Sequence, residues 1–582
     1  MELLYVWIEK FRNIEKKGFN LSNQYEVSYD STLNDLTINL IEDDNGLISA
    51  NGSLNFKSTT DHYLQGFFNI KSANTSANIS QITALIGKNS SGKSNIIDFI
   101  LTIMSKGRRN RITSNYLLIF KKDNELYFWG KTLKDNLTNS SLSSLQIPIN
   151  KSDPSDEWDT MFYSNVADNK EYLFEGSSVY NCSFDAMNKL QANKINFVNS
   201  EIFSDTWKKL SPENDKNKRI RFIFNPIAFL ELEKQLNNHE KVSGILKRYR
   251  KAIYQESTSN YNRFKYGLAI NLFCFLVSKS SNIEDFLKTI KLSGNDNIAE
   301  IIINLHKKIV AFLSSYQYSE IEESNDIDFN LYISLLLSLE NDKYDFGEIE
   351  RYSSSILIDF NDSFKDLIEG KQAVFNTPSL ISHDWSRLSS GMRAYLNLFS
   401  QLYSVSEEIK STNKSLLLCI DEGDLYLHPE WQKNFLNDLI WFISSVFKSK
   451  NVQIILTSHS PFLISDLPKE NVILLDDYCT PNRQLNEVSS FGANIHQLFT
   501  KQFFLTNGSI GEFAKKKITI LLKEIKEMNQ ENIEQYQQRI DMIGEPVLRF
   551  RLDDELKKRL KTLSKETQIK WHQSQISKLS NS

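Results

Sequence analysis

The chain opens with short apolar runs that are separated by polar turns. The runs at 5–8 and 36–40 alternate as half-buried strands do, which predicts a β-rich opening over residues 1 to about 80. A continuous apolar run at 82–86 predicts a buried strand, and the segment 95–101 has the apolar spacing of a helix. We therefore expect a strand, a short loop and a helix in that order.

Helical spacing replaces the strand pattern in the middle of the chain. Asn225-Pro226 supplies a cap and a first-turn proline, and helical spacing recurs at 227–235, 268–277 and 298–313. This region is predicted to be an inserted helical domain. It lacks heptads sustained over many turns, so a long coiled coil is not expected.

Helices and apolar strands alternate again from about 381 to 480, and this region is expected to complete the sheet begun before residue 100. Beyond about 480 the pattern is helical. The predicted class is therefore α/β. Its predicted parts are an N-terminal lobe at 1–224, the inserted helical domain at 225–380, a C-terminal lobe at 381–480 and a helical C-terminal region at 481–582.

Composition narrows the class of protein without naming a function. Hydrophobic residues make up 40% and charged residues 24%, as in globular proteins, and a net charge of -4 provides no overall basic field for nucleic acid. The four cysteines form no C-x-x-C pair, so neither a zinc knuckle nor a disulfide framework is expected. The sequence has neither a basic leader nor an apolar stretch of about 18 residues, so we expect a cytoplasmic protein without membrane association.

The loop between the expected strand and helix reads Gly87-Lys88-Asn89-Ser90-Ser91-Gly92-Lys93-Ser94 and fits the pattern G-x-x-x-x-G-K-[ST]. Small residues let the backbone wrap an anion with its N–H groups inward, and the following helix adds its positive end. Lys93 is expected to contact the β- and γ-phosphates of ATP, and Ser94 to ligate Mg²⁺. The predicted ATP-binding set here is Gly87, Asn89, Ser90, Ser91, Gly92, Lys93, Ser94 and Asn95.

Two later apolar strands end in residues that suit ATP hydrolysis. The run 416–420 ends in Asp421-Glu422, where Asp421 can hold the metal and Glu422 can polarise a water. The run 452–456 ends in Thr457-Ser458-His459, which makes His459 a candidate catalytic sensor of the γ-phosphate. For His428 we favour a structural turn, because Pro429 follows it and helix initiation explains the segment.

A short Ser/Gly element, Leu388-Ser389-Ser390-Gly391, precedes the strongly helical run 393–403. Hydroxyl and amide groups at a helix start favour anions. Taken with its place before the Asp-Glu strand, the element makes Ser389, Ser390 and Gly391 candidates for binding nucleotide.

The order of these motifs, together with Asp424-Leu425-Tyr426-Leu427-His428-Pro429-Glu430-Trp431-Gln432, resembles the ABC-type ATPases of the overcoming-lysogenisation-defect and RecF/SMC-like superfamily. Phe11-Arg12-Asn13 resembles that superfamily's first-strand motif, which implies that Arg12 approaches the nucleotide phosphates. The segments 491–496, 511–514 and 543–548 resemble the PtuA-type ATPase subunits of Septu and retron-associated anti-phage systems.

The resemblance implies an ABC-type P-loop ATPase core that uses ATP and Mg²⁺ and forms a homodimer, or a larger homo-oligomer. Ser389 and Gly391 of one subunit would contact the γ-phosphate held by Lys93 of another. The implied partners are a separate HNH-type nuclease or other effector, and a retron reverse transcriptase with its RNA or DNA. The chain departs from its relatives at Met392, where they usually carry Glu or Gln, and no lid glutamine is identified; Tyr163-Ser164-Asn165 resembles a segment near that lid.

Three other interpretations remain open. The chain could cut nucleic acid itself, but Asp553-Asp554-Glu555 lies in a Lys-rich helical setting that favours a solvated helix face. It could clamp DNA as a repair or chromosome-type ATPase through the basic segments 106–111 and 216–221. It could also act as a switch in which bound ATP holds an effector inactive. Lys557, Lys558, Arg559 and Lys561 mark either a partner or nucleic-acid surface or a plain amphipathic tail.

Overall fold

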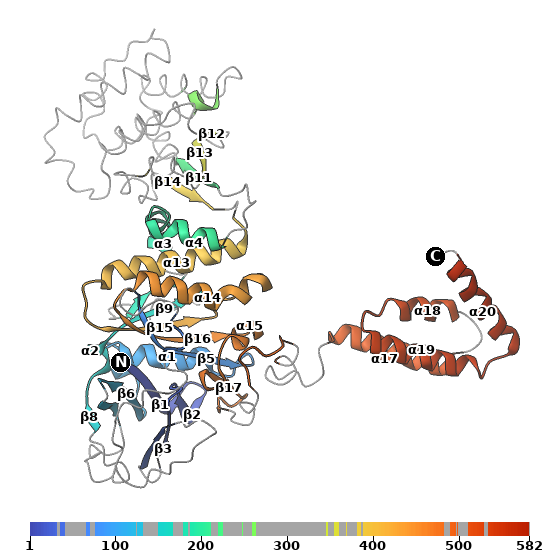
Figure 1. The fold of residues 1–582 in the computed structure, drawn as a ribbon, viewed down its shortest axis with the longest axis horizontal. Helices are drawn as coiled ribbons and strands as arrows, with labels where there is room; N and C mark the ends of the chain where they lie inside the picture. The colour runs from blue at the N-terminus through green and yellow to red at the C-terminus, as the bar shows by residue number, and fades with distance from the viewer. Residues whose placement is uncertain are drawn as a thin grey trace. The chain divides into compact units, whose positions relative to one another are not determined.

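The computed structural model is drawn in Figure 1, where the described residues appear as coloured ribbon. Its described parts combine parallel and antiparallel sheets with helices, which confirms the predicted α/β class. The described residues are 1–31, 35–40, 66–69, 76–123, 125–131, 149–166, 179–183, 187–210, 219–224, 247, 259–263, 345–346, 354–359, 368, 381–385, 388–481, 489–495, 498, 510–528 and 533–580.

A six-stranded parallel sheet forms the centre of the fold (Figure 1). Its strand order is β10-β9-β15-β16-β5-β17, so strands from the two predicted lobes lie side by side, and the expectation that 381–480 completes the first sheet is confirmed. These strands read as nearly continuous apolar runs because both faces of the sheet are covered. Their bounds are β5 Asn78–Gly87, β9 Trp158–Ser164, β10 Val179–Asn181, β15 Ser415–Asp421, β16 Asn451–Ser458 and β17 Val472–Leu475.

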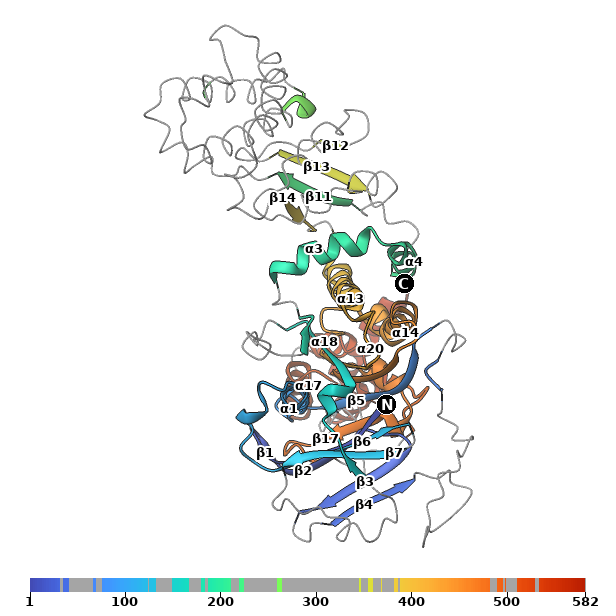
Figure 2. The ribbon, with the colours of Figure 1, turned by 90° about the vertical axis from the view of Figure 1, so that its left-hand side faces the viewer.

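Helices cover one face of this sheet (Figures 1 and 2). The 20-residue helix α13 (Ser390–Ile409) packs against α14 (Pro429–Val446) and α3 (Met187–Val198), and α4 (Glu201–Leu210) packs against α14. Phe442 of α14 joins the layer, since its ring centroid lies 4.6 Å from Phe399 and 5.8 Å from Phe197. This aromatic packing fixes the helix that follows the Ser/Gly element.

An antiparallel sheet that the sequence pattern did not predict follows the order β12-β13-β11-β14. Its strands are β11 (Arg219–Phe224), β12 (Asp345–Phe346), β13 (Ser354–Asp359) and β14 (Ile381–Asp384). Two of them, β12 and β13, lie within the range 225–380 that was assigned to the helical insert. The helices expected at 227–235, 268–277 and 298–313 lie outside the described residues.

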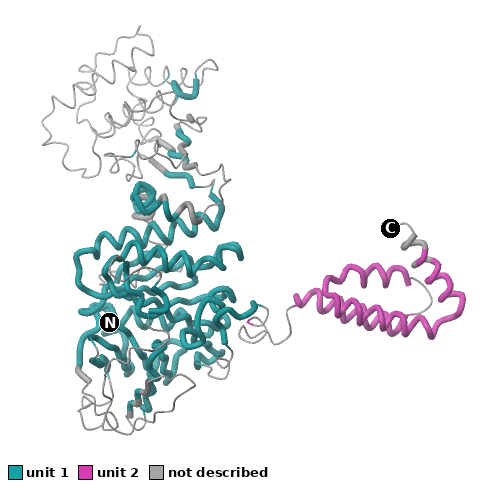
Figure 3. The backbone as a smooth tube through the Cα atoms, viewed as in Figure 1, with its two compact units in different colours: residues 1–495 teal, residues 496–582 magenta. Residues whose placement is uncertain are grey.

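The chain divides into two compact units, residues 1–495 and 496–582 (Figure 3). The second unit contains α17 (Glu512–Glu527), α18 (Ile533–Asp541), α19 (Pro546–Leu560) and α20 (Lys565–Ser580). These helices have a core of their own, which includes Leu521, Ile525, Ile540, Leu552 and Leu556. Among the described residues of both units, no helix is long and apolar enough to cross a membrane.

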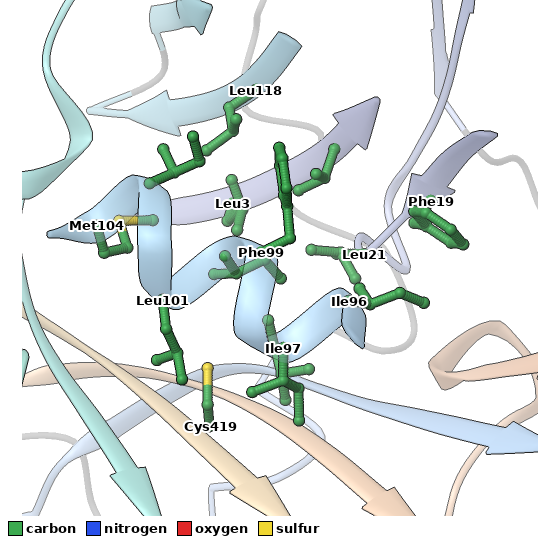
Figure 4. Close-up of a cluster of buried hydrophobic side chains, with 14 of the residues drawn as sticks. Leu3, Phe19, Leu21, Ile96, Ile97, Phe99, Leu101, Met104, Leu118 and Cys419 are labelled. Carbon is green, nitrogen blue, oxygen red and sulfur yellow. The ribbon is translucent and has the colours of Figure 1, made fainter. Parts of the chain in front are cut away.

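The helix after the phosphate loop, α1 (Lys93–Met104), lies between the parallel sheet and a five-stranded sheet (Figure 4). Ile97 and Leu101 of α1 share one buried cluster with Cys419 of the parallel sheet and with Leu3 and Leu118 of the other sheet. The five-stranded sheet has the order β2-β1-β6-β7-β8. Its strands are β1 Glu2–Phe11, β2 Ile14–Asn20, β6 Tyr116–Lys122, β7 Glu125–Lys131 and β8 Ile149–Lys151, and the neighbouring pair β3 (Tyr25–Asp30) and β4 (Asp35–Leu40) is antiparallel.

Candidate nucleotide site

The parallel register brings the ends of four strands to one edge of the sheet. Asp421 of β15 is level with Thr457 of β16 and with Ser164 of β9, and Ser458 of β16 is level with Ile86 of β5. Because β5 ends at Gly87, the phosphate loop begins at the same edge as the Asp-Glu pair. The phosphate loop, the Asp-Glu pair and the end of β16 therefore lie close together, although they are far apart in the sequence.

The loop has a backbone conformation that explains its glycines. Gly92 has a φ of 91°, in the left-handed region that favours glycine, and a Cβ there would lie 2.6 Å from Cys479 Sγ. At Gly87 a Cβ would lie 2.8 Å from the carbonyl oxygen of Leu475. Ser90 also has a positive φ, 67°, so the position left free by the pattern is one that glycine would occupy with less strain.

Lys93 folds its side chain back over the loop. Its Nζ donates to the carbonyl oxygens of Gly87 and Lys88, at 2.9 Å each, and the residue is 5% exposed. Burial lowers the pKa of the Lys93 amine, while the nearby carboxylates of Glu422 and Asp421 act in the opposite direction. The amine thus lies at the mouth of the loop, where a phosphate would replace these carbonyl contacts.

Asp421 accepts hydrogen bonds from hydroxyl groups of two other segments. Its Oδ1 accepts from Ser94 Oγ at 2.9 Å and from Thr457 Oγ1 at 2.6 Å. A carboxylate and a serine hydroxyl are the hard oxygen donors that Mg²⁺ takes when substrate phosphates and waters complete its shell. Ser94 and Asp421 therefore fit the predicted metal site.

Glu422 and His459 face each other at the same edge. His459 Nε2 lies 3.6 Å from Glu422 Oε1, and their side chains are 38% and 25% exposed. Glu422 has a φ of 50°, a left-handed conformation that turns the chain immediately after the strand. Burial first, and then the positive charge of Lys93, lower the pKa of His459, while Asp421 acts in the opposite direction. The lowered pKa favours the neutral imidazole, which has one donor and one acceptor nitrogen.

The turn between β1 and β2 contacts both the loop and α1. Arg12 Nη1 donates to Asn95 Oδ1 at 2.7 Å and to Asp98 Oδ2 at 2.5 Å, so the guanidinium lies on the flank of α1. Asn13 Nδ2 donates to the carbonyl oxygen of Ser90 at 3.1 Å, and its Oδ1 accepts from Asn95 at 2.7 Å. Asn95 is therefore held by this turn.

The Ser/Gly element begins α13 and is accessible from outside. Ser389 is the N-cap, with its hydroxyl accepting from the backbone N–H of Met392 at 3.2 Å, and both Ser389 and Ser390 are exposed. A Cβ on Gly391 would lie 3.4 Å from the ring of Trp431, in ordinary contact. Met392 is 6% exposed, so an apolar side chain suits this departure from the expected Glu or Gln.

Comparison with known families gives a clear match. A family model described as "AAA ATPase domain" matches residues 64–464, more than half of the chain. The chain belongs to the AAA ATPase domain family. The matched range contains the phosphate loop, the Ser/Gly element and the two strand ends with Asp421-Glu422 and His459.

Two curated relatives match only part of this AAA ATPase domain protein, one at low identity and the other over a short segment. Endonuclease GajA of Bacillus cereus (strain HuB5-5) is 24% identical over 285 residues, which are 47% of this chain and 37% of GajA. The Retron Ec83 probable ATPase of Escherichia coli is 41% identical over 59 residues, 10% of each chain. The matched part of this chain therefore spans about a third or less of either relative.

Solved structures give only weak likenesses. A structure of the recombination mediator protein RecF has 13% identity and a TM-score of 0.21, covering 79% of this chain and 93% of RecF. The Smc head domain of Pyrococcus furiosus has 14% identity and a TM-score of 0.18, covering 68% of this chain and 87% of that one. At these scores neither likeness carries an argument.

Several residues around the site escaped sequence reasoning. Thr457 received no role, although it bridges Asp421 and the backbone N–H of Glu422, which donates to Thr457 Oγ1 at 2.9 Å. Asn165, part of the segment expected near a lid, donates from Nδ2 to the carbonyl oxygen of Gly423 at 2.9 Å and so holds the turn after Glu422. Both residues could have been found from the sequence, because each is a polar residue at or just after the end of a parallel strand.

His428 and the described residues of the two basic segments take part in local structure. His428 is the N-cap of α14, its Nδ1 accepting from the N–H of Glu430 at 3.3 Å, which confirms the predicted structural turn. In the basic segment 106–111, Lys106 pairs with Asp156, Arg109 pairs with Asp153 at 2.6 Å, and Arg108 is buried. In the segment 216–221 only Arg219, Ile220 and Arg221 are described, as the start of β11.

Proposed function

We propose that this AAA ATPase domain protein is the ATP-hydrolysing regulatory subunit of a bacterial anti-phage defence complex. In this proposal it controls a partner nuclease or other effector through a homodimer that sandwiches ATP. The observation that carries the ATPase part is the hydrogen-bonded chain from Ser94 through Asp421 and Thr457 to the backbone of Glu422, next to Lys93 and His459. Three segments distant in sequence meet there.

The proposed hydrolysis assigns one task to each side chain. Lys93 and the N–H groups of the loop hold the β- and γ-phosphates, while Ser94 and Asp421 hold Mg²⁺, which supplies charge stabilisation on the phosphate oxygens. Glu422 accepts the proton of the attacking water as general base. His459, whose Nε2 lies 3.6 Å from Glu422 Oε1, orients the γ-phosphate and the Glu422 carboxylate.

The sandwich rests on the exposure of the Ser/Gly element. Ser389 and Ser390 lie exposed at the positive end of a 20-residue helix, in a position to meet the γ-phosphate of a second copy. Binding ATP between two copies would join their surfaces, so nucleotide occupancy would control the dimer. A larger homo-oligomer would require further surfaces.

The defence role is supported by the names of two relatives. GajA is named an endonuclease, and the Escherichia coli relative is named a probable ATPase of a retron. The PtuA-type motifs of the C-terminal region add to this and favour a separate HNH-type nuclease as partner, with a retron reverse transcriptase and its nucleic acid as further candidates. A cytoplasmic location follows from such partners.

Nuclease activity of the chain itself is the second candidate, because GajA is named an endonuclease. Against it, the acidic run on α19 is engaged locally: Asp554 pairs with Lys558 at 2.7 Å and Asp553 accepts from Gln537 at 2.9 Å. Incubation of the purified chain with plasmid DNA, Mg²⁺ or Mn²⁺ and ATP separates the two. Cleavage that survives Glu422→Gln but is lost in Asp553→Asn/Asp554→Asn would favour the nuclease.

The regulatory proposal is tested by purification from cells that express the neighbouring genes. We expect an effector to copurify with the wild-type chain, and its activity to change between wild type and a Glu422→Gln variant that traps ATP. A chain that hydrolyses ATP but binds no product of neighbouring genes would contradict the regulatory part and leave the ATPase part standing.

A further inference from the structure

The short loop after β17 lies against the phosphate loop on the side away from the catalytic strands. This loop reads Asp476-Asp477-Tyr478-Cys479-Thr480-Pro481 and follows Leu475, which is level with Gly87 in the sheet. Its neighbour in the sheet is β5, whereas β16 and β15, which carry His459 and the Asp-Glu pair, lie on the other side of β5. The function proposed above assigns this loop no role.

The loop has a defined conformation. Asp476 Oδ1 accepts from the backbone N–H of Tyr478 at 2.9 Å and of Thr480 at 2.8 Å, and the N–H of Cys479 donates to the carbonyl oxygen of Asp476 at 3.1 Å. An isolated bridge between Leu475 and Pro481 closes its base. Such a turn presents its outermost side chain without the ordering cost of a long flexible loop.

Three contacts tie this turn to the phosphate loop and to β2 beside it. Lys88 of the phosphate loop pairs with Asp477 at 3.1 Å, and Lys17 of β2 donates to Thr480 Oγ1 at 2.7 Å. Cys479 Sγ lies where a Cβ on Gly92 would collide with it. The turn therefore lines the loop that is proposed to hold the phosphates.

The order of strands gives a bound nucleotide a direction. Its γ-phosphate must face Asp421, Glu422 and His459, which lie at the ends of β15 and β16, on one side of β5. The rest of the nucleotide then extends away from those strands, toward β17 and the turn that follows it. At that end Tyr478 is 80% exposed, in a turn whose backbone is held by hydrogen bonds to Asp476.

We propose that Tyr478 forms the nucleobase subsite, stacking its ring on the adenine of the bound ATP. A purine offers a flat face, and stacking on an aromatic side chain suits it without base-specific hydrogen bonds. The subsite rests on the proposed ATP binding at Lys93. The subsite predicts that purine nucleoside triphosphates bind more tightly than tripolyphosphate, which has no base. It also predicts weak discrimination between adenine and guanine nucleotides.

Calorimetric titration of the full chain with Mg-ATP and with Mg-tripolyphosphate, which lacks a base, tests the subsite. We expect Tyr478→Ala to weaken ATP binding about tenfold, equivalent to about 1.4 kcal/mol, and to leave tripolyphosphate binding unchanged. Tyr478→Phe keeps the ring and should bind ATP as the wild type does. Phe550→Ala, at a 74% exposed aromatic of the second unit, is the matched control.

Two results would overturn the subsite. Unchanged ATP affinity in Tyr478→Ala would remove the base contact, and equal weakening for ATP and tripolyphosphate would mean that the residue acts through the loop. The proposed function has its own test in the same titrations. Lys93→Ala should lose both ligands, and if it keeps both, the phosphate site fails whatever Tyr478 does.

Discussion

The hydroxyl of Thr457 donates to Asp421 Oδ1 at 2.6 Å, and Thr457 Oγ1 accepts from the backbone N–H of Glu422 at 2.9 Å. One side chain of β16 therefore fixes the orientation of the candidate metal ligand and the backbone of the candidate base. Thr457 is 2% exposed, so water does not compete for these bonds. Thr457 is therefore a positioning residue for both candidate groups.

Thr457→Val keeps the shape of the side chain and removes both hydrogen bonds. In this variant the backbone N–H of Glu422 loses its acceptor, and Asp421 Oδ1 loses one of its donors. We therefore expect the free energy of unfolding to fall by about 1–3 kcal/mol, and ATP turnover to fall with it. Denaturant unfolding and phosphate release measure the two effects. Thr457→Ser retains the hydroxyl and is the control; equal loss in both variants would contradict the role of the hydroxyl.

Glu422→Gln removes the base but keeps the size of the side chain. We expect phosphate release to fall by about 10²–10⁴-fold, the usual contribution of a general base, while ATP binding is kept. Glu430→Gln changes a 66% exposed carboxylate on α14 and should leave turnover unchanged. If turnover persists in Glu422→Gln, another residue activates the water and the binding-only switch gains support.

Ser390→Arg tests the sandwich without touching the N-cap, because Ser389 provides that cap and Ser390 is exposed. We expect each monomer to bind ATP normally, while ATP-dependent dimerisation is lost because the bulky side chain blocks the second copy. Light scattering with ATP in a Glu422→Gln background measures the mass. Glu407→Arg, at an exposed position of the same helix, should still dimerise; dimers in both variants would place the interface elsewhere.

Asp424 predicts a pH dependence of stability. Burial raises its pKa from 3.8 to about 6, against the opposing hydrogen bond from Ser458. A buried acid with a raised pKa destabilises the fold when it is ionised, so the cost is full above pH 6 and disappears as the pH falls from 6 to 3.8. Asp424→Asn should therefore raise the free energy of unfolding by about 1–3 kcal/mol at pH 7.5.

Urea unfolding at pH 7.5 and 4.5 checks the sign of this effect. The gain from Asp424→Asn should be smaller at pH 4.5, where the wild-type carboxyl is already protonated in the fold. An equal gain at both values would mean that packing, and not charge, is responsible. Asp554→Asn removes a carboxylate from the exposed surface of α19 and is the control for loss of a carboxylate that is not buried.

Local patterns were sufficient to predict the elements that carry the motifs. The apolar run before Gly87 became β5, and the helix predicted at 95–101 became α1, because a buried strand and a helix with regularly spaced apolar residues each leave a signal within a few residues. The strand ends at Asp421 and Ser458 followed in the same way. The sheet edge that unites them was inferred from their order.

Relationships that depend on tertiary contacts could not be predicted. The pairing of β11 with β13 joins residues 219–224, just before the predicted insert, to residues 354–359 inside it, and no local pattern encodes that distance. The approach of Arg12 to the phosphates stays a prediction, and its hydrogen bonds to Asn95 and to the buried acid Asp98 join segments far apart in the sequence, which no local pattern encodes. Thr457 acquires its importance only through its neighbour in the register.

The two-sided burial of α1 has a consequence for how ATP energy is used. Ten of its twelve residues are buried, so the platform under the phosphates has little freedom to lose when nucleotide arrives. Binding then costs little conformational entropy at the loop, and the free energy that remains is available to move other parts of the molecule. A rigid phosphate platform of this kind would suit the proposed regulatory role, in which nucleotide occupancy has to change the conformation of other parts of the molecule.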